Sequence, residues 1–400
     1  MTQIKIAVAC QGGGSQTAFT AGAVKALIEA QAGEAGKEFK TVGISGTSGG
    51  AVCAALVWYA LHKKETPRWK RLIEFWQDNT AHGWSEETFN QFIIDAMRMA
   101  GRGWLPVFQL SPSSPLVQTM MSFMTLGSRR SFTDFQELLR KYIDFDEIAA
   151  WGAIPHPPVL VIGAADVSTG RLAKFVSARE PIRLEHILAS CAVPNIFPAV
   201  EIDGDAYWDG LFSDNPPVEE LIRPRSVGEG NIPDEIWLIK INPTARKRVP
   251  LESGDILDRR NQLEGNISLF HQLDHIEMIN DMILAGAFTP EFLGLLGVKT
   301  AIRIPKSFDT DPDKLYHIPC IEMPVEVQEK LDYEGKIDRS AKNIDFLIAQ
   351  GEAAAKEFLT RRATAVAANP LPGPGEGPKF AEVMAAVQKT YEPRNRREIP

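Results

Sequence analysis

Two glycine-rich turns, each placed directly after a short apolar run, most constrain how this chain can fold. The first run, residues 4–10, leads into Gly12-Gly13-Gly14, and the second, residues 41–45, leads into Gly46-Thr47-Ser48-Gly49-Gly50. Apolar residues at helical spacing follow both turns. A continuous apolar strand, a glycine turn and a helix are typical of a buried parallel β-α unit. We therefore predict an α/β fold with both turns at the carboxyl edge of one sheet, where open sheets bind ligands.

The second turn has the G-x-S-x-G form of a nucleophile elbow. Gly46 and Gly50 would let the chain turn sharply enough to present the Ser48 hydroxyl above the sheet. The triple glycine would offer backbone N–H groups at a helix start, and such groups can hold the negative oxygen that forms when a serine attacks an ester. The two turns together predict acyl transfer by an activated serine.

Composition narrows the class of protein. With 400 residues, 44% of them hydrophobic and 24% charged, the chain is long enough for one large α/β domain and an appendage. A net charge of −8 argues against nucleic acid as a partner, since Arg394, Arg396 and Arg397 form only a short basic stretch. No run approaches the roughly 20 apolar residues of a membrane span, and residues 1–10 read as a strand and not as a signal peptide. We predict a cytoplasmic protein.

Cofactor motifs do not fit the glycine turns. The triple glycine lacks the third glycine of G-x-G-x-x-G, the second strand ends in Ser45-Gly46 without a ribose-binding acid, and no Gly-Lys-Ser/Thr is present. We therefore expect no nucleotide cofactor. The four cysteines are scattered through apolar segments without a C-x-x-C pair, which predicts reduced, buried thiols and no metal site. They are Cys10, Cys53, Cys191 and Cys320.

The sheet signal stops over residues 66–151, where short helical stretches before Trp151 carry four of the eight Trp and five of the ten Met. We predict a helical cap over the core. Packing alone would explain these residues, but they could also form an adaptable wall for an apolar acyl chain, or touch a membrane surface. The tryptophans are Trp69, Trp76, Trp84 and Trp104, and the methionines are Met97, Met99, Met120, Met121 and Met124.

The periodicity also predicts the remaining elements. Later strands are expected at 159–165, 172–177, 199–202 and 235–241, with helices at 18–30, 51–61 and 182–191. The α/β core would close near Asn242-Pro243. Long helices at 255–288 and 338–364 around an apolar piece at 316–323 predict a mostly helical extension, followed by a Pro/Gly linker at 369–378 and a final helix at 380–391.

A serine nucleophile requires a base, and the sequence leaves its identity open. A hydrolase triad in the order Ser, acid, His would allow Asp209 with His271, His275 or His317, although the elbow of that fold follows more than two strands. The alternative base is Asp209 itself. Taken alone, Asp209-Gly210 reads as a hairpin turn, as does Asp203-Gly204 just upstream. The other histidines are His62, His82, His156 and His186.

Four blocks in order resemble the patatin-like phospholipases. They cover residues 4–245 and imply a three-layer α/β/α core, with a C-terminal extension over 246–400. Two positions depart from the family pattern, which has Arg or Lys at Gln16 and Gly or Ala at Leu211. The blocks are Gly12-Gly13-Gly14-Ser15-Gln16-Thr17-Ala18-Phe19-Thr20-Ala21-Gly22 (oxyanion segment), Gly46-Thr47-Ser48-Gly49-Gly50 (elbow), Ala189-Ser190-Cys191-Ala192-Val193-Pro194-Asn195-Ile196-Phe197-Pro198 (third block) and Asp209-Gly210 (acid motif).

The resemblance implies a Ser-Asp dyad in a lipid acyl hydrolase. Asp209 would accept the Ser48 proton, and N–H groups of the glycine segment, Gly12 to Ser15, would hold the oxyanion. Gly210 and Pro194 would support the acid motif and the third block. Two other functions remain open: hydrolysis of soluble acyl esters such as thioesters or storage polyesters, and a catalytically inactive lipid-binding or scaffold protein, which the loss of a cation at Gln16 favours.

Overall fold

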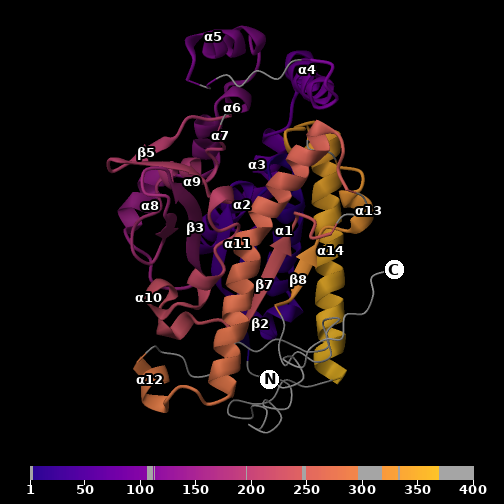
Figure 1. Ribbon diagram of the computed structural model, residues 1–400. Coiled ribbons are helices and arrows are strands. Elements are labelled where there is room, and N and C mark those ends of the chain that lie inside the picture. Colours follow the sequence, from indigo (N-terminus) through magenta and orange to yellow (C-terminus); the bar gives the residue numbers. More distant parts are fainter. Residues whose placement is uncertain are drawn as a thin grey trace.

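A mixed sheet of eight strands forms the centre of the computed structural model (Figure 1). The structure describes residues 3–105, 111, 113–194, 196–245, 249–295, 318–331 and 334–368. Strand order is β5-β6-β3-β2-β1-β7-β8, and β4 pairs with β3. The strands are β1 (Ile4–Cys10), β2 (Phe39–Thr47), β3 (Val159–Asp166), β4 (Leu172–Val176), β5 (Val200–Ile202), β6 (Asp205–Asp209), β7 (Glu235–Lys240) and β8 (Cys320–Glu322).

The register of the sheet brings distant parts of the chain to one edge. Strands β3, β2, β1, β7 and β8 run parallel to one another, whereas β4 and β6 pair antiparallel with β3 and β5 pairs antiparallel with β6. Thr47 at the end of β2 pairs with Gly163, and the next residue of β3, Ala164, pairs with Asp209. The elbow therefore lies at the end of β2, the acid motif begins at the last residue of β6, and these two strands lie on either side of β3.

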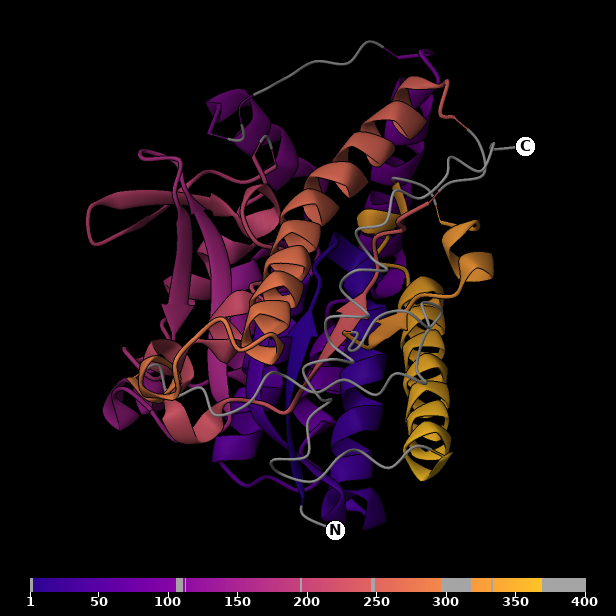
Figure 2. The same ribbon diagram turned by 60° about the horizontal axis from the view of Figure 1, so that its bottom comes forward.

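Side-chain alternation along the strands defines two covered faces. Ile6, Val8 and Cys10 of β1 belong to one apolar cluster, while Ala7 and Ala9 belong to another. The first cluster joins the sheet to α1 (Ala18–Ala32), α2 (Gly49–His62) and α14 (Ala341–Ala368), and the second joins it to α11 (Ser253–Leu284). The result is the three-layer α/β/α architecture that the sequence predicts. Figure 2 shows α11 and the α1–α14 pair packed against the sheet.

Short helices fill the region expected to be a cap. In Figure 1, α4, α5 and α6 lie at the end of the molecule opposite the N-terminus. Trp76 of α3 is buried against the core, whereas Trp84 and Trp104 are 82% and 69% exposed, so packing alone does not explain these tryptophans. The helices are α3 (Lys70–Asp78), α4 (Gly83–Gly101), α5 (Pro115–Met124), α6 (Arg130–Thr133), α7 (Phe135–Tyr142) and α8 (Phe145–Trp151).

The C-terminal part packs directly on the sheet. Strand β8 extends the sheet beside β7, and α14 packs along α1. The sheet therefore includes residues beyond the predicted end of the core at residue 245. Close approach is possible because Gly22 and Gly351 lack side chains: a Cβ on either would overlap a backbone carbonyl of the facing helix. The remaining helices are α9 (Leu184–Ser190), α10 (Pro224–Val227), α12 (Pro290–Leu295) and α13 (Val325–Gln328).

Most predicted elements are present within a few residues of their expected bounds. Strand β6 was not predicted, because its five residues lie between two Asp-Gly pairs that both read as turns. Only the first of these pairs is a hairpin turn: Asp203 and Gly204 have φ values of 55° and 97°. Gly210 instead begins the 3-10 helix Gly210–Phe212, labelled η3. The linker at 369–378 and the helix at 380–391 lie outside the described residues.

Candidate active site

Ser48 occupies a strained turn between β2 and α2. Its φ of 56° and ψ of −133° are backbone angles that residues other than glycine seldom adopt. The Ser48 N–H donates to Ser190 Oγ at 2.9 Å, and the Ser190 hydroxyl donates to the Gly163 carbonyl at 2.6 Å. Because Ser190 is fully buried, these two bonds fix the strained turn to strand β3.

Asp209 lies at the end of β6 with its side chain fully buried. Oδ1 accepts the Leu211 N–H at 2.8 Å, while the buried Oδ2 has no hydrogen bond of standard geometry to the described residues. The Asp209 N–H donates to the Ala192 carbonyl at 2.9 Å. Ala192 and Ser190 both belong to the third block. That block therefore accepts hydrogen bonds from the backbone N–H groups of both Ser48 and Asp209.

Burial raises the pKa of Asp209 to about 7. Hydrogen bonding from the Leu211 N–H and a weaker interaction with the Ser48 side chain oppose this shift. The Ser48 hydroxyl therefore lies within interaction range of the carboxylate. A carboxyl group that titrates near neutrality is suited to accept and return a proton at physiological pH. Ser48 is partly exposed, so the pair is open to an incoming molecule on the serine side.

The glycine turn lies directly on the elbow. A Cβ at Gly12 would overlap the Thr47 carbonyl oxygen and lie 2.7 Å from Ser48 Cβ, so only glycine fits there. Two of the four expected oxyanion donors are already engaged: the Gly12 N–H donates to Asn215 Oδ1 at 2.8 Å and the Gly13 N–H to Thr17 Oγ1 at 3.0 Å. Gly14 and Ser15 begin the 3-10 helix Gly14–Thr17, labelled η1, whose first N–H groups have no partner within the helix itself.

The other glycines of the motifs also mark close contacts. A Cβ at Gly46 would overlap the Gly50 carbonyl, and one at Gly50 would overlap the Cys10 carbonyl. A Cβ at Gly210 would lie 2.6 Å from the Gly163 oxygen. Pro194 lies in the turn after α9, and Asn195 of the same block is outside the described residues.

The two departures from the family pattern have different surroundings. Gln16 is only 7% exposed and takes part in an interaction, so it is not a free side chain at the opening of the site. The Leu211 side chain reaches α11 next to Gly265, where a Cβ would lie 3.0 Å from Leu211 Cδ1. A larger residue after Asp209-Gly210 is thus accommodated by a glycine on the facing helix.

No histidine hydrogen-bonds Ser48 in the part of the chain that the structure describes. His275 contacts Glu219 at 2.8 Å, His62 contacts the Pro158 carbonyl at 3.0 Å, and His186 stacks on Phe175. Burial lowers the pKa of His186 to about 3, so its ring stays neutral. His317 lies outside the described residues. Among the described side chains, Asp209 therefore remains the candidate base for Ser48.

Sequence reasoning missed Ser190 and Asn215 as site residues. Ser190 lies inside the third block, but its role depends on a hydrogen bond from Ser48, which is 142 positions away in the sequence. Asn215 follows the acid motif by six residues, and its amide reaches Gly12 across 203 residues. The Asn-Pro-Pro sequence at 215–217 was the available signal for a fixed loop.

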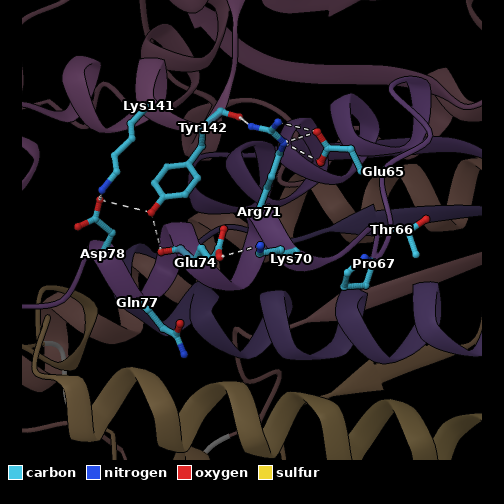
Figure 3. Close-up of a pocket in the computed structure, with 10 residues that line it drawn as sticks. All are labelled: Glu65, Thr66, Pro67, Lys70, Arg71, Glu74, Gln77, Asp78, Lys141 and Tyr142. Carbon is cyan, nitrogen blue, oxygen red and sulfur yellow. Dashed lines mark hydrogen bonds and ion pairs between the residues drawn. The ribbon is translucent and has the colours of Figure 1, made fainter.

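A cavity of about 710 Å³ lies away from this site, on the outer side of α3 (Figure 3). Charged side chains line it and pair with one another: Arg71 with Glu65 at 2.6 Å, Lys141 with Asp78 at 2.6 Å. None of the predicted site residues borders it. Its polar walls do not suit an acyl chain, so we place the candidate active site at Ser48 and Asp209 instead.

The described residues contain no cluster of three or more His, Cys, Asp or Glu that could hold a metal ion. None of the four cysteines forms a disulfide with another described residue; Cys10 and Cys53 are buried, while Cys191 and Cys320 are partly exposed. Among the helices in the described ranges, none is long and apolar enough to cross a membrane.

The fold and the paired turns define an α/β protein with a serine elbow beside a buried acid. Comparison with known proteins then gives the family: the patatin-like phospholipase sequence model matches residues 8–222, so the chain belongs to the patatin-like phospholipase family. Membership supports lipid acyl hydrolase activity in general. Among solved structures, VipD from Legionella pneumophila is 11% identical, with a TM-score of 0.32, 97% of this chain and 79% of that chain being covered. No curated protein matches the chain.

Proposed function

We propose that this protein hydrolyses carboxylic esters of lipids, as a phospholipase A or lysophospholipase, through a dyad of Ser48 and Asp209. The observation that carries the proposal is the buried Asp209 carboxyl, which has one oxygen held by Leu211 N–H, the other without a standard partner, and the Ser48 hydroxyl within interaction range. This arrangement leaves one carboxylate oxygen available as a base.

In the first half-reaction, Asp209 accepts the Ser48 proton while Ser48 Oγ bonds to the acyl carbonyl carbon. The N–H groups of Gly14 and Ser15 hold the resulting oxyanion, because those of Gly12 and Gly13 are engaged. The protonated Asp209 then gives its proton to the leaving alkoxide as the C–O bond breaks. Water repeats the same steps on the acyl-enzyme and releases the fatty acid.

Apolar side chains close to the dyad in sequence support a substrate with an acyl chain. Phe212 follows Asp209 by three residues and is half exposed, and Ile196 and Phe197 of the third block are similarly exposed. Exposed large apolar side chains of this kind are suited to contact an apolar substrate. Nothing at these positions fixes a head group, so we leave the alcohol that departs to experiment.

The test uses the purified chain and a panel of phospholipids, lysophospholipids, triacylglycerols, acyl thioesters and polyesters. Ser48→Ala and Asp209→Asn should each abolish hydrolysis, and a fluorophosphonate should label Ser48 in the wild type. Asp205→Asn is the matched control, since Asp205 lies on the same strand but is exposed. Full activity in Asp209→Asn would refute the dyad. Preferential hydrolysis of thioesters or polyesters would show that the substrates are soluble acyl esters and not lipids. A wild type that is inactive and unlabelled would favour a lipid-binding protein without catalytic activity.

We also propose that the exposed apolar face of α4 and α5 contacts lipid surfaces. Trp84 and Phe123 are 82% and 74% exposed, and the Arg102 guanidinium lies over the Trp104 ring at 5.8 Å, a pairing suited to a membrane interface. Trp84→Ala with Trp104→Ala should reduce sedimentation with anionic vesicles. Leu295→Ala, at the exposed α12 near the opposite end of Figure 1, should not. Unchanged sedimentation of the double variant would refute this contact.

A further inference from the structure

Helix α11 carries polar side chains that are buried in the protein. Asp258, Gln262, Asn266 and Gln272 are all at most 5% exposed, although amide and carboxylate side chains are mostly found at protein surfaces. Buried polar groups in native proteins are normally hydrogen-bonded. The partners of these side chains therefore indicate what the helix holds in place.

One chain of amide groups runs from α11 to the glycine turn. Asn266 Oδ1 accepts from Gln11 Nε2 at 3.0 Å, and the same nitrogen lies 3.3 Å from the Asn215 carbonyl. Gln11 Oε1 accepts the N–H groups of Ile241 and Asn242 at 3.0 and 2.8 Å. Both ends of the Gln11 amide are thus occupied, and its orientation is fixed.

Asn215 links this network of amide hydrogen bonds to Gly12, the glycine that packs against Ser48. Its Oδ1 accepts the Gly12 N–H at 2.8 Å, and its Nδ2 donates to the Gly12 carbonyl at 3.2 Å. A single side chain therefore clamps both polar groups of the glycine that packs on the elbow. Because Asn215 lies in the loop after Asp209, the acid loop and the glycine turn are held together.

The next turns of α11 bind the same loop further along. Ser268 Oγ donates to Asp214 Oδ1 at 2.5 Å, and Gln272 Oε1 accepts the Val218 N–H at 2.7 Å while its Nε2 donates to the Pro216 carbonyl at 3.2 Å. One face of the helix thus contacts the loop over residues 214–218. Figure 2 shows α11 running across this side of the sheet.

We propose that α11, which lies beyond the matched family region 8–222, is a positioning element of the active site. Through Asn266, Gln11 and Asn215 it sets the distance between the glycine turn, Ser48 and the Asp209 loop. Asn266 and Gln11 are positioning residues and touch no reacting atom. The inference rests on the proposed Ser-Asp hydrolase function.

The test compares Asn266→Ala with Asn280→Ala in the full chain. Asn280 is a matched control, since it is also a buried asparagine of α11 and its Nδ2 has no partner in the described structure. Active sites are titrated with a fluorophosphonate, so that kcat is expressed per competent site. Asn266→Ala should lower kcat about 10- to 100-fold with KM changed less than threefold, as expected for a misplaced catalytic group. Asn280→Ala should leave both unchanged.

A kcat per titrated site equal to wild type would overturn the proposal, because a merely structural role reduces only the number of competent sites. If Asn266→Ala does not fold, Gln11→Glu replaces it: it keeps the acceptor for Ile241 and Asn242 but removes the donor toward Asn266. Hydrogen exchange of peptides 8–17 and 209–217 should be faster in either variant. An inactive, unlabelled wild type would refute the proposed hydrolase, whereas unchanged exchange would refute the coupling by α11.

Discussion

The buried carboxyl of Asp209 should make the stability of this protein depend on pH in a defined way. Burial raises its pKa to about 7, while an aspartate in an unfolded chain titrates near about 3.9. The folded state therefore holds the proton more tightly. As the pH rises from about 4 to about 7, the unfolded chain releases this proton before the folded protein does, so the free energy of unfolding falls.

The size of this effect follows from the shift. About three pKa units at about 1.4 kcal/mol each give a decline of about 4 kcal/mol between pH 4 and pH 7, with no further change above. Asp209→Asn removes the ionisable group but keeps an oxygen that can accept the Leu211 N–H. The variant should therefore gain stability relative to wild type as the pH rises, by about 4 kcal/mol in total.

Urea unfolding followed by tryptophan fluorescence at pH 4, 5.5, 7 and 8 would measure this difference. Asp205→Asn serves as the comparator, because Asp205 is exposed on the same strand. The difference between Asp209→Asn and wild type should increase with pH, while that of Asp205→Asn stays flat. A difference for Asp209→Asn that is constant within about 1 kcal/mol across this range would refute the reasoning that burial keeps the carboxyl protonated.

Three further predictions follow from the same contacts. If Asp209 is the base, kcat/KM should rise about tenfold per pH unit below pH 7 and level off above it, since only the ionised form accepts the Ser48 proton; a flat profile from pH 5 to 8 would contradict this. Ser190→Ala leaves the Ser48 N–H and the Gly163 carbonyl without their partner and should reduce both stability, by about 1–3 kcal/mol, and fluorophosphonate labelling; wild-type labelling would show that the elbow holds its own shape. Gly12→Ala forces a Cβ into the Thr47 carbonyl and should abolish labelling, whereas Gly230→Ala, with open space around it, should not; equal labelling of the two variants would contradict the close packing.

Local sequence determined much of the fold and the identity of the dyad candidates. Strands β1 and β2 and the helices after them follow from apolar runs and glycine turns, which depend on neighbouring residues only. Ser48 was identifiable because an elbow needs glycines on both sides in sequence. Asp209 was one of several candidates for the base, and only the resemblance singled it out, since Asp-Gly by itself predicts a turn. Its strand, β6, was missed for the same reason.

The tertiary structure alone decided how these pieces are held together. The sequence indicated a C-terminal extension of unassigned role, yet α11 supplies Asn266 to the network that fixes Gly12, and β8 completes the sheet. The pKa of Asp209 likewise depends on burial by residues from several elements, which no local pattern encodes. Hydrogen bonds between residues 142 to 255 positions apart carry no periodic signal, because chain folding and not spacing brings their partners together.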